Sequence, residues 1–269
     1  MVKNVNDCYN SSQADFHNER AINLAEKGWI DEAVKELKKA IKIDPENAAA
    51  YDNLANIYCD KGKLGKALNL YLKSIEIEPD NPTAHFNLGC FLATKGQELA
   101  VLSYNKSIKL EWDFPDAHLN LGLALLDLGD STQAETEFRH ATTLCPDDYQ
   151  ARFELALLLL EGEKYTEAIK ELRTILKNQP DFPDANLYLG AAYVQKGFLR
   201  EGEKALKQAL VHDDSNGLTY YYLAVIQLRQ NKEKEAIVLV KRALQLSYSS
   251  VLNLLQNNSL FDKVKAKIA

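Results

Sequence analysis

The sequence predicts an all-α fold, a right-handed α-solenoid of seven tandem helix–turn–helix repeats with a C-terminal capping helix. Two slots of a 34-residue period carry this prediction, because every copy fills both with Ala or Gly. The first slot holds Ala21, Ala55, Gly89, Gly122, Ala156, Gly190 and Ala224. The second slot, about twelve positions later, holds Ala33, Ala67, Ala100, Ala134, Ala168, Gly202 and Ala236. Repeats of this length bury their apolar faces by stacking on their neighbours.

Each repeat is expected to consist of a first helix of about thirteen residues, a turn and a second helix. The seven repeats are predicted at 14–47, 48–81, 82–114, 115–148, 149–182, 183–216 and 217–250. Residues 1–13 are expected to be a polar N-terminal tail. Residues 251–269 are expected to be a C-terminal capping segment, in which Leu260, Phe261, Val264 and Ile268 share one side of a short helix.

Glycines mark the predicted turns, because glycine readily takes the left-handed conformation that ends a helix. They are Gly28, Gly62, Gly96, Gly129 and Gly197. The third repeat is one residue short between its turn and Ala100, so we expect a tighter turn there. Small side chains at the first slot let the first helix approach the second, and large side chains on the second helix fill the gap that remains.

The composition excludes several classes of function. The net charge is −6, with 32 basic and 38 acidic residues, and no basic stripe is visible, so nucleic acid is not expected as a partner. No apolar run is long enough to span a membrane, and the first residues lack a secretory signal, so we expect a cytoplasmic protein without membrane insertion. The four cysteines and five histidines lack zinc-ligand spacing. No metal, cofactor or catalytic site is predicted, and the chain is not expected to be an enzyme.

The repeats also share residue types around the first small slot, in segments such as residues 51–55 (YDNLA), 85–89 (HFNLG) and 118–122 (HLNLG). On these residues and the Ala, aromatic and Pro slots that follow, the chain resembles the tetratricopeptide repeat family. The resemblance covers nearly nine-tenths of the chain. It implies stacked helix pairs, and it says little about function, because packing residues define this family.

The inner face of such a stack is formed by the first helices, and it is where we expect the binding site. Its first part is acidic and hydrogen-bonding, and from the third repeat onward it is apolar and aromatic, which is typical of an interaction surface. The predicted peptide-binding residues are Asp52, Asn53, Asn56, Phe86, Asn87, Leu119, Asn120, Leu123, Phe153, Leu157, Leu187, Tyr188, Tyr221 and Tyr222. The alternative is that tight curvature buries the apolar residues against one another.

Asn53, Asn87 and Asn120 occupy one inner slot in three consecutive repeats. An amide both donates and accepts hydrogen bonds, so such a row can hold an extended peptide backbone. The row resembles the asparagine ladder of the O-linked N-acetylglucosamine transferases. Some tetratricopeptide co-chaperones clamp a carboxylate terminus with cations at slots that here hold Asp52 and Asp116, so chaperone C-termini are not expected as ligands.

These features favour an adaptor or scaffold whose concave groove binds a peptide segment of another protein. The expected ligand carries apolar anchors, with basic residues opposite the acidic start of the groove. A homo-oligomeric scaffold with head-to-tail contacts is one alternative. A substrate-presenting or regulatory domain of a larger enzyme is another.

Overall fold

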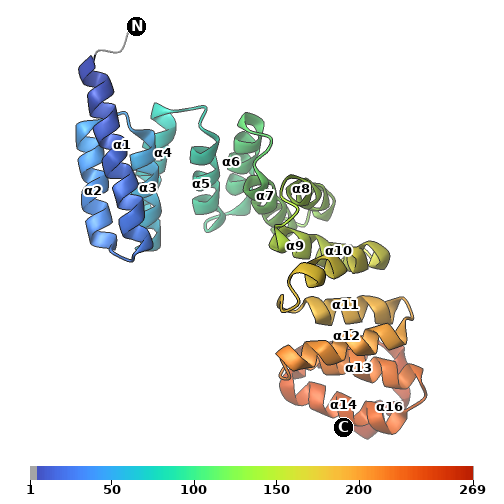
Figure 1. The fold of residues 1–269 in the computed structure, drawn as a ribbon. Helices are drawn as coiled ribbons and strands as arrows, with labels where there is room; N and C mark the ends of the chain where they lie inside the picture. Colours follow the sequence, from blue (N-terminus) through green and yellow to red (C-terminus); the bar gives the residue numbers. More distant parts are fainter. Residues whose placement is uncertain (1–4, 269) are drawn as a thin grey trace. The chain divides into compact units, whose positions relative to one another are not determined.

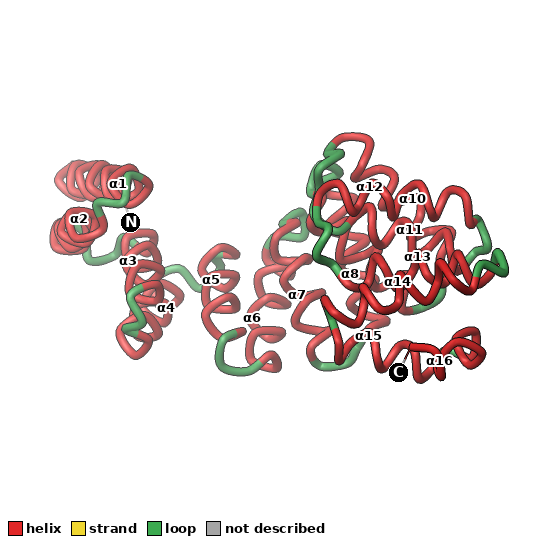
Figure 2. Tube along the Cα trace, turned by 90° about the horizontal axis from the view of Figure 1, so that it is seen from below, coloured by secondary structure: helices red, strands yellow, loops and turns green. Residues whose placement is uncertain are grey.

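The computed structural model describes residues 5–268, with the side chains of residues 5–8, 266 and 268 excepted, and the described residues are helices joined by short loops (Figures 1 and 2). The first helices of the repeats are α1 (Val5–Glu26), α3 (Ala48–Asp60), α5 (Pro82–Ala93), α7 (Pro115–Asp127), α9 (Tyr149–Glu161), α11 (Ala185–Gln195) and α13 (Gly217–Arg229). The second helices are α2 (Ile30–Ile43), α4 (Leu64–Ile77), α6 (Gln97–Leu110), α8 (Ser131–Leu144), α10 (Tyr165–Asn178), α12 (Leu199–His212) and α14 (Glu233–Leu246). The chain then forms α15 (Tyr248–Asn257), the short 3-10 helix η1 (Ser259–Phe261) and α16 (Asp262–Ile268).

The helices pack in antiparallel pairs, each first helix against the second helix of the same repeat. The chain divides into two compact units, α1–α8 up to Cys145 and α9–α16 from Pro146. Within each unit, second helices also contact the first helix of the next repeat, as α2 contacts α3 and α12 contacts α13. The predicted all-α fold of stacked helix pairs is confirmed. No helix in the described part of the chain is long and apolar enough to cross a membrane.

The small slot of the first helices has a steric cause. A β-carbon on Gly122 would lie 2.6 Å from the ring of Phe138 on the second helix, far inside van der Waals contact. A β-carbon on Gly89 would meet the ring of Tyr104 at the same distance. The structure therefore confirms that the small residue on the first helix packs against a large side chain on the second.

The turns follow the predicted left-handed geometry in most repeats, with one correction. Four glycines take positive φ values, Gly28 (79°), Gly62 (68°), Gly129 (83°) and Gly197 (83°). In the fifth and seventh repeats Glu163 and Asn231 take this place, with φ of 57° and 61°. The expectation for Gly96 is wrong: its φ is 167°, because the missing residue brings it to the N-cap of α6, where the backbone is extended.

Polar residues just before the first helices fix where these helices start. The side-chain oxygen of Asn47 accepts a hydrogen bond from the Ala50 amide (2.9 Å), and Asp148 accepts one from the Ala151 amide (3.0 Å). Such caps satisfy amides that have no partner within the helix.

Both ends of the chain differ from the expected boundaries. The segment predicted as a polar tail is helical from Val5 onward, because residues 5–13 contain no proline or glycine and run directly into Ala14, which is buried. At the other end, α15 begins at Tyr248, before the predicted end of the seventh repeat. Phe261 and Val264 are buried against α13 and α14, whereas the side chain of Ile268 lies outside the described residues.

Candidate functional site

The predicted binding residues lie on two separate sets of first helices. Eight of them, from Asp52 to Leu123, are on α3, α5 and α7 of the first unit, where α3 contacts α5 and α5 contacts α7. The other six, from Phe153 to Tyr222, are on α9, α11 and α13 of the second unit. Each set is therefore described as a surface of its own unit.

The asparagine row of the first unit joins neighbouring repeats. Nδ2 of Asn53 donates to Oδ1 of Asn18 (2.9 Å), and Nδ2 of Asn87 donates to Oδ2 of Asp52 (2.7 Å). Nδ2 of Asn120 instead donates to the backbone oxygen of Asp116 in its own helix (2.8 Å). Two of the three amides thus have a structural role between repeats, which the sequence analysis did not anticipate.

Asp52 is the most unusual polar group of this surface. It is only 6% exposed, and its Oδ1 is buried without a hydrogen-bond partner. The pKa of Asp52 is raised to about 6: burial is the main cause, the hydrogen bond from Asn87 opposes the rise, and the nearby Glu78 carboxylate adds to it. A carboxylate in this state favours a proton on its buried, unpaired oxygen.

The remaining predicted residues of the first unit are half-buried. The hydroxyl of Tyr71 donates to Oδ1 of Asn56 (2.6 Å). The Phe86 ring packs against that of Phe114, with centroids 4.9 Å apart. In the next repeat, the apolar side chains of Leu119 and Leu123, both on α7, are also half-buried.

In the second unit, the expectation of an open apolar groove is wrong for two residues. Leu187 is 2% exposed and Tyr221 is 5% exposed, so both belong to the core. The C-terminal segment covers Tyr221, since Nδ2 of Asn258 donates to its hydroxyl (2.9 Å) and the Phe261 ring stacks on it at 5.4 Å. Because neighbouring elements bury these two side chains, they are not accessible to a ligand.

Four predicted residues of the second unit keep part of their surface. The Phe153 ring contacts that of Tyr188, with centroids 5.7 Å apart, and both side chains are half-buried. Leu157 and Tyr222 are also half-buried, and burial raises the pKa of Tyr222 to about 12. They form an apolar surface without charged groups of their own.

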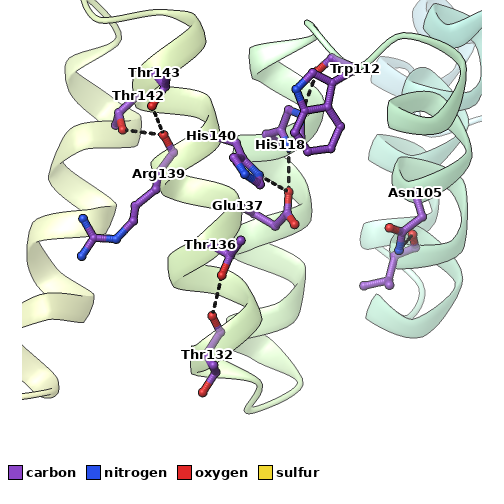
Figure 3. Close-up of polar contacts among 11 residues, drawn as sticks. Asn105, Trp112, His118, Thr132, Thr136, Glu137, Arg139, His140, Thr142 and Thr143 are labelled. Atoms are coloured by element: carbon purple, nitrogen blue, oxygen red, sulfur yellow. Dashed lines mark hydrogen bonds and ion pairs between the residues drawn. The ribbon is translucent and has the colours of Figure 1, made fainter.

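A polar cluster between α7 and α8 was missed by the sequence analysis (Figure 3). Nδ1 of His118 lies 2.6 Å from Oε2 of Glu137, and Nδ1 of His140 lies 3.7 Å from the same oxygen. The ring of Trp112 contacts both imidazoles edge-on, with centroids 4.8 Å apart in each case. The three ligand-type groups are 19 and three residues apart in sequence, a spacing that points to no known motif.

The structure is similar to solved proteins built from the same repeat. YrrB, described as a TPR protein with an unusual peptide-binding site, superposes with a TM-score of 0.60 at 24% identity, over 68% of this chain and 95% of YrrB. PilF of Pseudomonas aeruginosa gives 0.63 at 17% identity, over 82% and 97%. MamA of Desulfovibrio magneticus RS-1 gives 0.58 at 24% identity, over 62% and 96%. At these identities the likeness concerns the fold alone.

Comparison of sequences leads to the same family. The BBSome complex member BBS4 of Bos taurus is 24% identical over 231 residues, which are 84% of this chain and 44% of BBS4, so the chain spans less than half of that relative. The family description "TPR repeat" matches residues 23–58 and 55–96. The description "Tetratricopeptide repeat" matches residues 98–149, 119–183, 153–197 and 187–249. These matches take in most of the residues, and the chain belongs to the tetratricopeptide repeat family.

Proposed function

We propose that the inner face of the first unit, formed by α3, α5 and α7, binds an extended peptide segment of a partner protein. Tetratricopeptide repeats are protein-interaction modules, so an interaction scaffold is the function that the family supports. The proposal adds the surface and the kind of ligand.

The observation that carries the proposal is the way the asparagine side chains are held. Asn53 and Asn87 each donate one N–H to a side chain of the preceding repeat. Beyond that bond, each amide has a second N–H and a carbonyl oxygen, which are the groups needed to pair with a peptide backbone. Because the inter-repeat hydrogen bonds fix the amide planes, little side-chain entropy would be lost when a ligand binds them.

The neighbouring groups define the ligand further. The half-buried Leu119 and Leu123 offer an apolar contact for a side chain. The ligand that fits is an extended segment with an apolar anchor.

The test starts from peptides selected by display of random twelve-residue sequences on the full chain. Their affinities are then measured by calorimetry for the wild type, Asn120→Ala and Leu123→Ala. Loss of one hydrogen bond corresponds to about 0.5–1.5 kcal/mol, or roughly a two- to tenfold weaker affinity for Asn120→Ala. Leu123→Ala should weaken binding by a similar or larger factor.

The matched control is Leu102→Ala, because this leucine is exposed on the second helix α6. It should leave the affinity unchanged. Unchanged binding by both inner-face variants, or equal loss in the control, would place the site elsewhere. Light scattering over a concentration series tests self-association: a mass that grows with concentration in the wild type and not in Asn120→Ala would favour the homo-oligomeric scaffold instead.

A further inference from the structure

The cluster of His118, Glu137 and His140 belongs to a position that recurs in other repeats. In the first repeat His17 pairs with Glu36 (2.6 Å), and in the fifth Arg152 pairs with Glu171. In both of these repeats the cationic or imidazole group is on the first helix and the glutamate is 19 residues later on the second. The fourth repeat contains the same pair, with an added imidazole.

Both ring nitrogens of His118 face an acceptor, which limits how the ring can be protonated. In the fifth repeat, Arg152 donates both to Glu171 and to the backbone oxygen of Pro146, as its several N–H groups allow. His118 faces the corresponding two acceptors, since its Nδ1 lies beside Glu137 and its Nε2 lies 2.9 Å from the backbone oxygen of Trp112. A carbonyl can only accept, so Nε2 carries the proton. In the neutral ring, the lone pair of Nδ1 then faces the carboxylate of Glu137, and this contact requires a cation or a second proton between them.

His140, the third residue of the cluster, has a ring nitrogen without a hydrogen-bond partner. In the first repeat the residue three positions after the glutamate is Lys39, whose Nζ lies 2.7 Å from Glu36 and supplies positive charge. In the fourth repeat this position holds His140, whose Nδ1 is buried and has no hydrogen-bond partner. A lone-pair donor thus replaces the lysine beside a glutamate that also faces the fully buried His118.

We propose that His118 Nδ1, the Glu137 carboxylate and His140 Nδ1 bind a divalent transition metal ion, with Zn²⁺ as the ion that fits best. The three ligand atoms lie within 4.8 Å of one another. Ligand atoms on a tetrahedral zinc ion are about 3.3 Å apart, as follows from metal–ligand distances of roughly 2.0–2.1 Å. The two separations from the Glu137 oxygen, 2.6 and 3.7 Å, bracket that value, and the bound of 4.8 Å on every pair leaves about 1.5 Å to be closed by side-chain rotation.

The surroundings agree with a metal site. Two imidazoles and one carboxylate are a common ligand set for zinc, with the fourth position open to water. The bond from Nε2 of His118 to the Trp112 carbonyl is the outer contact that metal-bound histidines usually make, and it selects the tautomer whose Nδ1 is free for the ion. The ion would join α7, α8 and, through that bond, the loop before α7.

The test is calorimetric titration of the full chain with Zn²⁺ at neutral pH, with Co²⁺ absorption in the visible range as a second probe. Two variants restore arrangements that the chain already uses elsewhere. His140→Lys recreates the lysine of the first repeat, and His118→Arg recreates the Arg–Glu pair of the fifth. Both should keep the helical circular dichroism signal and weaken Zn²⁺ binding by at least about tenfold. His212→Lys is the control, because this exposed histidine pairs with Asp181 (3.7 Å) and is not part of a three-residue ligand cluster among the described residues.

The expected result is one Zn²⁺ per wild-type chain, a tetrahedral Co²⁺ spectrum and an unchanged affinity in His212→Lys. The proposal is overturned if the wild type binds Zn²⁺ no more tightly than the two folded variants. It is also overturned if His212→Lys loses affinity to the same extent. Should one variant fail to fold, the other decides the question alone.

Discussion

Replacing Asp52 with asparagine should stabilise the first unit at neutral pH and remove a pH dependence. The pKa of this carboxyl is raised by burial from its ordinary value of 3.8 to about 6. One pKa unit corresponds to about 1.4 kcal/mol, so the ionised side chain destabilises the fold by about 3 kcal/mol above pH 7. Asparagine can still accept the hydrogen bond from Asn87, but its own N–H groups would meet the place where Oδ1 has no partner. We therefore expect a smaller net gain of about 1–3 kcal/mol at pH 7.5.

The direction of the pH effect follows from which state binds the proton. Between pH 3.8 and about 6 the folded chain holds a proton on Asp52 that the unfolded chain has released. Lowering the pH through this range thus stabilises the folded wild type, and raising the pH above 6 removes that contribution completely. From pH 7.5 to pH 5 the wild type should gain about 1.5 kcal/mol relative to Asp52→Asn.

The assay is urea unfolding at pH 5.0 and 7.5, followed by circular dichroism and tryptophan fluorescence. Both tryptophans, Trp29 and Trp112, are in the first unit, so the fluorescence reports on the unit that contains Asp52. Asp60→Asn is the control, because this aspartate is at the exposed end of the same helix. An identical pH dependence of stability in the wild type and in Asp52→Asn would refute the reasoning.

Three further changes test the packing and the turns by thermal unfolding. Gly122→Ala should cost about 1–3 kcal/mol, since the new β-carbon meets the Phe138 ring, whereas Gly65→Ala, with open space around it, should be neutral or stabilising; equal effects would contradict the steric account. Asn87→Ala should cost about 1–3 kcal/mol by leaving buried Asp52 without its donor, and Asn120→Ala less than about 0.5 kcal/mol; a reversed order would refute the structural role of Asn87. Glu163→Gly should stabilise the protein by about 1 kcal/mol, because glycine takes a φ of 57° without strain. Asn231→Gly should stabilise it by less, because asparagine tolerates this conformation. A loss of stability in Glu163→Gly would show that the turn is not strained.

The sequence predicted features that repeat at a fixed period, because each copy meets the same local environment. The Gly122 slot and the left-handed turn at Gly129 are of this kind. Positions where one repeat departs from the others were harder. The missing residue in the third repeat moved Gly96 to a helix N-cap, and the C-terminal segment buried Tyr221, which was expected in the groove.

The candidate site was only partly predictable for a related reason. Sequence placed Asn53, Asn87 and Asn120 in one slot of successive first helices. Their partners depend on which residue occupies the partner slot of the preceding repeat, and this differs: it is Asn18 for Asn53 and Asp52 for Asn87, but for Asn120 it is Phe86, whose ring cannot accept a hydrogen bond. The His118–Glu137–His140 cluster required knowing that α7 and α8 face each other in that register, which no local spacing indicates.

The central claim, that the inner face of the first unit binds an extended peptide, is tested most directly by hydrogen–deuterium exchange of the full chain with and without a selected peptide. Contact with side chains of α3, α5 and α7 should slow exchange in these helices and leave α4, α6 and α8 unchanged. The protection should be lost in Leu123→Ala at the same peptide concentration. Slowed exchange confined to the second helices, or to the second unit, would contradict the account.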